Sequence, residues 1–297
     1  MHNYLRAAGF SEYNTEGIVY RFIRNSVIKP EYITARLDLG DGTVLLEYRM
    51  PINAFVGICA AELVSQGEFS EIQYYYPYFD GPEVSTTAVC TVEKHTNADT
   101  YSGVIDEYSV GMSLIFFLSN PVNYRLRHNN DNISEFRGTI LSAFSNEATV
   151  LLPVVPQGDP LDPLKAPEVK SIFDSDEPIV ISEDGEPEFN EALIDADIDM
   201  YNQISERIES EDLYSLVEQS FMPCGVECDQ YSVIGEILDY TEHVNELTEE
   251  KLSFLKLSCN DVEFWLCIRR DDILGEPQQG RRLKCRIWLT GMVNVDF

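Results

Sequence analysis

Polar and apolar residues alternate most regularly near the C-terminal end of the chain. Every second residue from Leu283 to Leu289 is apolar, which is typical of a half-buried β-strand. The opposite face of this strand carries three basic residues and a tryptophan: Arg282, Lys284, Arg286 and Trp288.

A hairpin is predicted just upstream, around Asn260-Asp261. Apolar residues alternate on both sides of these two residues, and a two-residue turn there pairs the two arms. The predicted cross-strand pairs are Cys259 with Val262, Leu257 with Phe264, and Leu255 with Leu266. Residues 231–297 are therefore predicted to form a small antiparallel, barrel-like β module.

The first half of the chain begins with helical spacing and continues with strands. Apolar residues at 18, 22, 23 and 27 predict a helix that starts near Thr15 and ends before Pro30. Alternation then recurs after a turn at Gly40-Asp41-Gly42. Residues 110–118 are apolar at almost every position, which predicts a strand buried on both faces. We therefore expect residues 1–155 to form an α+β domain with a mixed or antiparallel sheet.

The middle of the chain is acidic. Residues 156–187 are rich in proline and acids and predict a linker, and helical spacing from residue 188 predicts a pair of helices before the β module. The expected domains are thus residues 1–155, the linker, and residues 188–297. The expected fold class is α+β.

The net charge and the number of cysteines narrow the range of partners and cellular compartments that we expect. The net charge is −30, and residues 156–250 carry 27 acidic and 3 basic residues. The negative electrostatic field of these charges disfavours binding to nucleic acid and to anionic membranes, and it favours binding to a basic protein partner. The odd number of cysteines, 7, indicates reduced thiols, and no basic-then-apolar leader pattern starts the chain. We expect a cytoplasmic protein without a transmembrane segment.

Several runs of residues resemble an uncharacterised protein family of anaerobic, Clostridia-type bacteria. The resemblance spans nearly the whole chain and implies a bacterial cytoplasmic protein, without an activity or catalytic residues to transfer. The runs are MHNYLRAAGF (1–10), VGMSLIFF (110–117), GVECDQYSVIGEI (225–237), DILGEP (272–277) and GRRLKCRIWL (280–289).

Signals for catalysis and metal binding are weak. Cys224 and Cys228 are a close pair, and His243 could add a third metal ligand, but a tetrahedral site needs about four. Glu93 and His95 share a strand face and could work together in acid–base catalysis. They could equally be polar residues of an exposed strand edge. We predict no catalytic residue, no metal and no cofactor.

Two groups of residues are candidates for binding. Tyr74, Tyr76 and Tyr78 belong to a run of five aromatic residues in six, which either packs internally or recognises a partner. The basic face at 282–288, with Trp265 and Lys256 on the same outer side of the neighbouring hairpin, could bind a phosphate backbone or dock on the protein's own acidic helices. The charge favours internal docking.

The sequence therefore favours a cytoplasmic bacterial binding or interaction protein without evident catalysis. An alternative is a nucleic-acid or nucleotide-binding protein that uses the C-terminal β module. A third reading is an enzyme whose site the sequence does not reveal.

Overall fold

A computed structural model describes residues 4–40, 42–65, 70–95, 100–107, 110–127, 135–136, 138–151 and 219–293. The chain divides into two units, one made of Met1–Leu152 with Gln219–Phe297 and the other of Pro153–Glu218. All described residues belong to the first unit. The predicted linker at 156–187, the predicted helical pair and its docking on the basic face lie outside the described residues.

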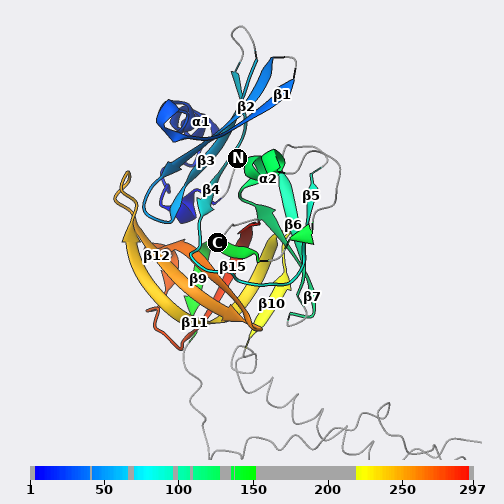
Figure 1. Cartoon of the computed structure of the whole chain (residues 1–297). Coiled ribbons are helices and arrows are strands. Elements are labelled where there is room, and N and C mark those ends of the chain that lie inside the picture. The colour runs from blue at the N-terminus through cyan, green and yellow to red at the C-terminus, as the bar shows by residue number, and fades with distance from the viewer. Residues whose placement is uncertain are drawn as a thin grey trace, which may run out of the picture. The chain divides into compact units, whose positions relative to one another are not determined.

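The described part of the chain is mainly β. Strands contain 58% of these residues and helices 14%. The two α-helices among them are α1 (Glu16–Phe22) and α2 (Pro121–Arg127), shown in Figure 1. Shorter helical turns are η1 (Arg6–Ala8), η2 (Ile23–Val27), η3 (Pro30–Tyr32) and η4 (Arg270–Asp272). The expected α+β class is corrected to mainly β, because the first helical stripe supports only α1 and η2 before the chain becomes extended at Lys29.

The N-terminal sheet is an antiparallel meander in the order β1-β2-β3-β4. Its strands are β1 (Ile33–Gly40), β2 (Thr43–Pro51), β3 (Val56–Val64) and β4 (Ser70–Phe79). The predicted turn between β1 and β2 is confirmed, since Gly40 and Gly42 have φ of 86° and 75°, a left-handed backbone that favours glycine. The predicted helix is confirmed as α1 and η2, and its buried Phe22 and Ile23 pack in one cluster with Tyr48 of the sheet.

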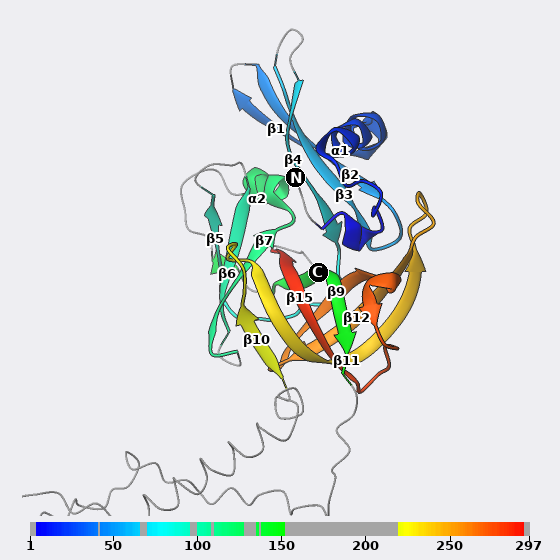
Figure 2. The ribbon, with the colours of Figure 1, turned by 180° about the vertical axis from the view of Figure 1, so that it is seen from behind.

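The C-terminal half forms a five-stranded mixed barrel. Its strands are β9 (Ile140–Val150), β11 (Gln230–Val244), β12 (Lys251–Cys259), β13 (Val262–Arg269) and β15 (Arg282–Met292). They follow the order β11-β12-β13-β9-β15, and β15 pairs with β11 to close the ring. Figure 2 shows β9 beside β15 from behind. The strands of residues 231–297 pair antiparallel with one another, as predicted, but the barrel is mixed because β9, from outside that range, pairs in parallel with β13.

The predicted hairpin is confirmed as β12 and β13. Cys259 pairs with Val262, Leu257 with Phe264, and Leu255 with Leu266. Asn260 and Asp261 both have positive φ, 49° and 63°, as a tight two-residue hairpin turn requires. The ring of Phe264 is 1% exposed and lies in the barrel core.

Shorter strands extend the barrel. The strand predicted at 110–118 is β7 (Met112–Leu118), which lies between β6 and β15. Phe116 packs into the barrel core and Phe117 into the cluster shared with the N-terminal sheet, so both faces of β7 are covered. The remaining strands are β5 (Cys90–Lys94), β6 (Tyr101–Glu107), β8 (Glu135–Phe136), β10 (Ser220–Pro223) and β14 (Ile273–Leu274). No helix among the described residues is both long and apolar enough to span a membrane.

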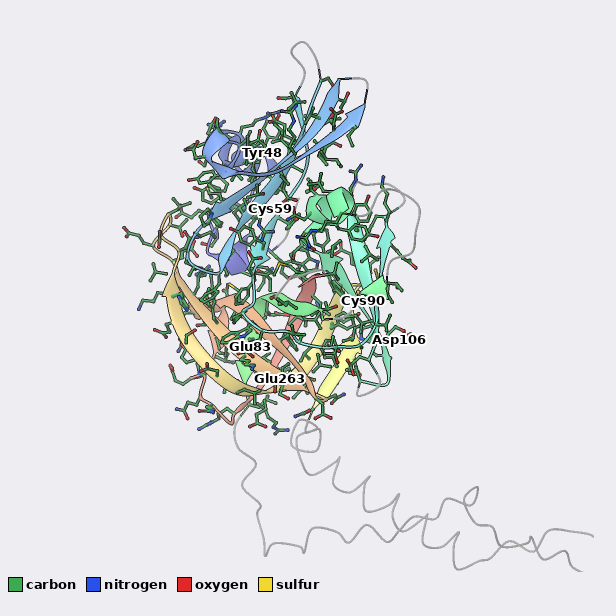
Figure 3. All side chains as sticks on the ribbon, in the orientation of Figure 1. Tyr48, Cys59, Glu83, Cys90, Asp106 and Glu263 are labelled. Atoms are coloured by element: carbon green, nitrogen blue, oxygen red, sulfur yellow. The ribbon has the colours of Figure 1, made fainter. Side chains whose placement is uncertain are left out.

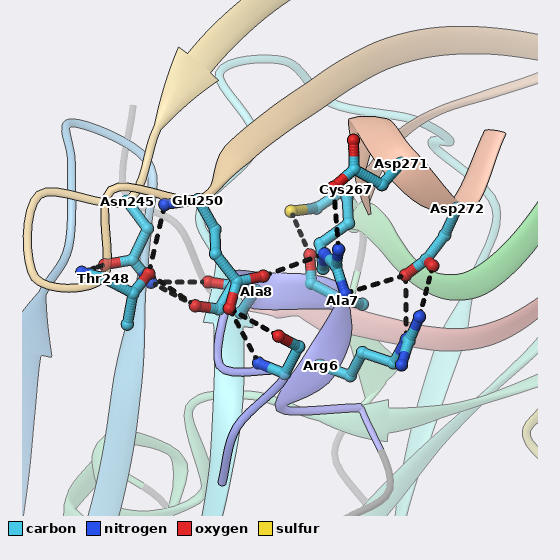
Figure 4. A network of polar contacts seen from close by, with 12 residues as sticks. Arg6, Ala7, Ala8, Asn245, Thr248, Glu250, Cys267, Asp271 and Asp272 are labelled. Atoms are coloured by element: carbon cyan, nitrogen blue, oxygen red, sulfur yellow. Dashed lines mark hydrogen bonds and ion pairs between the residues drawn. The ribbon is translucent and has the colours of Figure 1, made fainter.

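A polar network holds the N-terminal segment on the barrel (Figure 4). The Asn245 amide donates to the carbonyls of Ala8 and Gly9 at 2.9 and 3.1 Å, and the Thr248 hydroxyl donates to Gly9 at 2.7 Å. Arg6 Nε donates to Asp272 at 2.9 Å. These bonds place the segment around η1 against the outer side of the barrel strands.

Candidate functional site

Only part of the predicted basic face is exposed to solvent. Arg286 is exposed, whereas Arg282 and Lys284 are half-buried. The side chains between them are buried in the barrel, as the alternation predicted: Leu283, Cys285 and Ile287.

Trp288, the fourth residue of this face, lies in the interior. It is 2% exposed, and its ring stacks on Tyr4 with centroids 5.4 Å apart. Its Nε1 donates a hydrogen bond of 2.9 Å to Asp229 Oδ2. Burial raises the pKa of Asp229, and the Trp288 hydrogen bond opposes that shift. The four candidate residues therefore do not share one accessible surface.

The three candidate tyrosines pack within the protein. Tyr76 is buried, and its hydroxyl donates to the Ser119 carbonyl at 3.2 Å. Tyr78 is buried beneath the Arg49 guanidinium, which lies 3.9 Å from the ring centroid. Burial is the main cause that raises the pKa of Tyr78 to about 12. Tyr74 is half-buried and stacks on Tyr76 at 5.8 Å.

Sequence reasoning missed three charged residues near these tyrosines: Glu47, Arg49 and Asp80, of which the Asp80 side chain is 42% exposed. Arg49 Nη2 donates to Asp80 Oδ1 at 2.6 Å. Glu47 is fully buried, and burial raises its pKa, while the Thr34 hydroxyl lies 3.3 Å from Glu47 Oε1. Figure 3 labels Tyr48, which lies between Glu47 and Arg49 on β2, and Cys59 of β3, which pairs with Arg49. Alternation along β2 placed Glu47 on one face or the other but did not show that both faces are covered.

The groups considered for metal binding or catalysis lie in different places. Within the described ranges, no three His, Cys, Asp or Glu side chains lie close enough together to hold a metal ion. Cys228 is exposed as a residue, but partial desolvation of its thiol raises the pKa of that thiol. Glu93 is exposed, and His95 Nε2 lies 2.6 Å from Ser102 Oγ. Ser102 is only 7% exposed, so its hydroxyl is poorly placed to attack a substrate.

A hollow with aromatic walls lies where the end of β4 meets the outer side of the barrel. We call it the aromatic pocket, and its volume is about 250 Å³. Three barrel strands and two N-terminal loops build it, because outward residues of β11, β12 and β13 meet the ends of β3 and β4. Its lining residues are Phe55, Phe79, Pro82, Thr241, His243, Phe254 and Trp265.

The rings of the aromatic pocket surround Phe254, which is buried. The His243 ring stacks on Phe254 with centroids 4.2 Å apart, and Phe55 stands nearly perpendicular to both. Phe79 lies 4.9 Å from Phe254 on another side and 6.5 Å from Trp265. Phe55 is 36% exposed, so the rim of the pocket is open to solvent.

Few polar atoms enter the aromatic pocket. Trp265 Nε1 is buried and has no hydrogen-bond partner among the described residues. Thr241 Oγ1 lies 3.2 Å from His243 Nε2. Burial lowers the pKa of His243, which favours the neutral imidazole at neutral pH. The arrangement suits binding of an uncharged, largely apolar group.

Residues 5–291 match the family described as "Domain of unknown function, E. rectale Gene description (DUF3881)". The chain belongs to this family. Its name comes from Eubacterium rectale, a Clostridia-type anaerobe, which agrees with the resemblance found in the sequence. No curated protein and no solved structure matches the chain.

Most of the aromatic pocket of this DUF3881 member was invisible to sequence reasoning. Trp265 was predicted on the outer side of the hairpin together with Lys256, and their direct pairing confirms that placement. Phe79 belonged to the recognised aromatic run, but Phe55, His243 and Phe254 carried no local signal of a shared site. They lie up to 199 positions apart in sequence, so only the packing of the two sheets brings them together.

Proposed function

We propose that this DUF3881 member is a bacterial cytoplasmic binding protein rather than an enzyme, and that the aromatic pocket is its binding site. Seven free thiols, five of them buried, support a reducing compartment. The acidic charge supports a basic protein as a further partner.

The observation that carries the proposal is a hollow of about 250 Å³ with aromatic walls and an open rim, where Phe55 is 36% exposed. Ligand sites are concave and are lined mainly by apolar and aromatic side chains. Apolar surface exposed to water costs free energy, so a ligand that covers these rings would stabilise the protein.

The nucleic-acid alternative has weaker support. Five-stranded barrels of the oligonucleotide-binding type hold nucleic acid on the outer face of two adjacent strands. Here part of the outer side of β12 and β13 is covered, since Leu252, Phe254 and Cys267 pack in one cluster with the N-terminal segment. Lys256 on that side is paired with Glu83 and Glu263, both labelled in Figure 3. Phosphate binding needs available cations, and the net charge is −30.

The proposal is tested with protein labelled by 5-fluorotryptophan, which gives two ¹⁹F resonances because the chain has 2 tryptophans. Small apolar compounds, both aromatic and saturated, are titrated. We expect the Trp265 resonance to shift saturably and the Trp288 resonance to stay in place. A spectrum in which neither resonance moves, or both move alike, contradicts the proposal.

Two variants complete this test. Phe55→Ala removes one wall of the pocket and should weaken binding by about 2–10-fold, the value of one aromatic contact. Leu274→Ala is the matched control, because Leu274 is 71% exposed and does not line the pocket. Equal weakening in both variants would argue against the pocket as the site.

A further inference from the structure

One edge of β11 has no partner strand in the second half of that strand. Pairing with β15 ends at Glu236, and the backbone of Ile237 then bonds to residues 280 and 281. From there to Val244, β11 pairs only with β12 among the described strands. We propose that this free edge binds an extended, basic segment of another protein, which joins the sheet as an antiparallel strand. The inference rests on the basic partner of the proposed function and not on the aromatic pocket.

The backbone groups of the free edge point away from β12. Asn245 donates its N–H across the β11–β12 hairpin at 2.9 Å, so every second residue back from Asn245 also faces β12. The residues between them, Tyr240, Glu242 and Val244, direct their N–H and C=O groups to the free edge. In agreement, the Tyr240 N–H donates to the Asp239 carboxylate at 2.8 Å and not to β12. An added antiparallel strand makes two hydrogen bonds with each of these residues.

The terminal strands of the two sheets are less suited to pairing. β1 has two register shifts against β2, and β8 has only two residues. β4 contains Pro77, and β10 ends at Pro223. Proline and bulges protect a strand edge from pairing. By contrast, β11 contains no proline, and it pairs with β12 from Asp239 to Val244 without a shift.

The charge around the free edge selects the partner. Residues 236–250 include six acidic residues and no lysine or arginine. Asp239 is exposed, and the Glu242 side chain is 54% exposed. Arg270 lies 3.8 Å from Glu242, but Glu276 holds it more closely, at 2.7 Å.

Opposite charges on paired strands stabilise the pairing, and like charges destabilise it. A second copy of β11 would bring the same carboxylates to the edge, so pairing between two copies is disfavoured. A segment with lysine or arginine opposite Asp239 and Glu242 is favoured. The occupant is therefore a basic strand of another protein.

The side chains along the edge define a probe peptide. Val244 is 48% exposed and takes an apolar residue opposite, whereas Glu242 and Asp239 each take a lysine. Written antiparallel to β11, the probe is the acetylated and amidated hexapeptide Val-Thr-Lys-Thr-Val-Lys. Its matched control has N-methyl groups on the third and fifth residues. The control keeps the charge and loses two N–H groups that would face β11.

Both peptides are titrated into the ¹⁵N-labelled full chain at pH 7.5. We expect the probe to shift the amide signals of Tyr240, Glu242 and Val244 and to slow their hydrogen exchange. The N-methylated control should bind about 10-fold more weakly, as the loss of two net hydrogen bonds predicts. Equal binding of the two peptides overturns strand addition but leaves the basic partner. Binding of neither overturns both, while the aromatic pocket is judged separately by the tryptophan resonances.

Val244→Pro tests the backbone of the edge from the protein side. Proline is tolerated where a strand's N–H does not face its neighbour, and it should weaken binding of the probe by about 3–10-fold. Val244→Ala is the matched control, because it keeps the N–H and should bind more tightly than Val244→Pro. Equal binding by these two variants overturns strand addition. The N-methylated peptide tests the same hydrogen bonds on wild-type protein, so the result does not depend on the folding of Val244→Pro.

The double variant Asp239→Asn with Glu242→Gln tests the charge. It should weaken binding of the probe by about 2–10-fold and reduce the dependence of binding on salt. Unchanged affinity and unchanged salt dependence would overturn the selection of a basic partner. That result would assign the carboxylates only the role of keeping an exposed edge unpaired.

Discussion

The two tryptophans of this protein mark two regions on the outer side of one barrel, and their surroundings differ. Trp288 on β15 is covered by the N-terminal segment, stacks on Tyr4 and donates to Asp229. Trp265 on β13 borders the aromatic pocket, and its N–H has no partner among the described residues. The first region is completed by the chain itself. The second is a hollow with an open rim, where we propose that a ligand binds.

This contrast shows that an outward position on a barrel strand does not decide whether a side chain can be reached by a ligand. Both tryptophans occupy outward strand positions. The N-terminal segment, which Asn245, Thr248 and Asp272 hold, covers Trp288 together with Phe117 of β7. Trp265 instead borders the aromatic pocket.

The largest effect is expected from replacing each tryptophan by phenylalanine. Trp288→Phe removes the donor to buried Asp229 and should cost about 1–3 kcal/mol of unfolding free energy. Trp265→Phe reduces the same ring volume but breaks no hydrogen bond within the described residues, so it should cost about 1–3 kcal/mol less than Trp288→Phe. Urea unfolding of both variants measures the difference. Equal costs would mean that the two regions do not differ as described.

A smaller effect is expected from loosening the cover over Trp288. Gly9 has φ of 83°, and an added Cβ would lie 3.0 Å from the Asn245 side chain. Gly9→Ala should therefore cost about 1–2 kcal/mol and shift the Trp288 fluorescence or ¹⁹F signal, while the Trp265 signal stays unchanged. Gly17→Ala is the control, because Gly17 lies in α1 with open space around it and alanine favours a helix there. A stable Gly9→Ala protein would show that the cover tolerates the change.

The smallest effect is the dependence of stability on pH. The stability change has opposite signs in the two regions as the pH rises. Burial raises the pKa of Asp229, so its ionised form destabilises the folded state as pH rises above about 4. Burial lowers the pKa of His243, so protonation destabilises the folded state as pH falls below its ordinary value of 6.5. Asp229→Asn should thus gain stability over the wild type at pH 7 and lose that gain at pH 3. His243→Gln should gain relative to the wild type only at acidic pH. Unfolding midpoints across pH 3–8 measure both, and parallel profiles would contradict the assignment.

Local pattern was enough wherever the decisive contacts are close in sequence. Asn260 and Asp261 are the turn of a hairpin whose apolar residues alternate on both sides, so its register followed from the chain. The spacing before Pro30 likewise predicted α1 and η2. In both cases the backbone hydrogen bonds that define the element join residues of that element, whereas more distant segments bury its side chains.

Tertiary structure alone decided the closure of the barrel and the fates of the outward residues. Nothing in the local sequence of β9 indicates its parallel pairing with β13 across more than 110 positions. By themselves, the residues determined which side chains leave each strand on the same face. What covers that face depends on segments folded from elsewhere, and this is why Trp288 became core while Trp265 became the wall of a pocket.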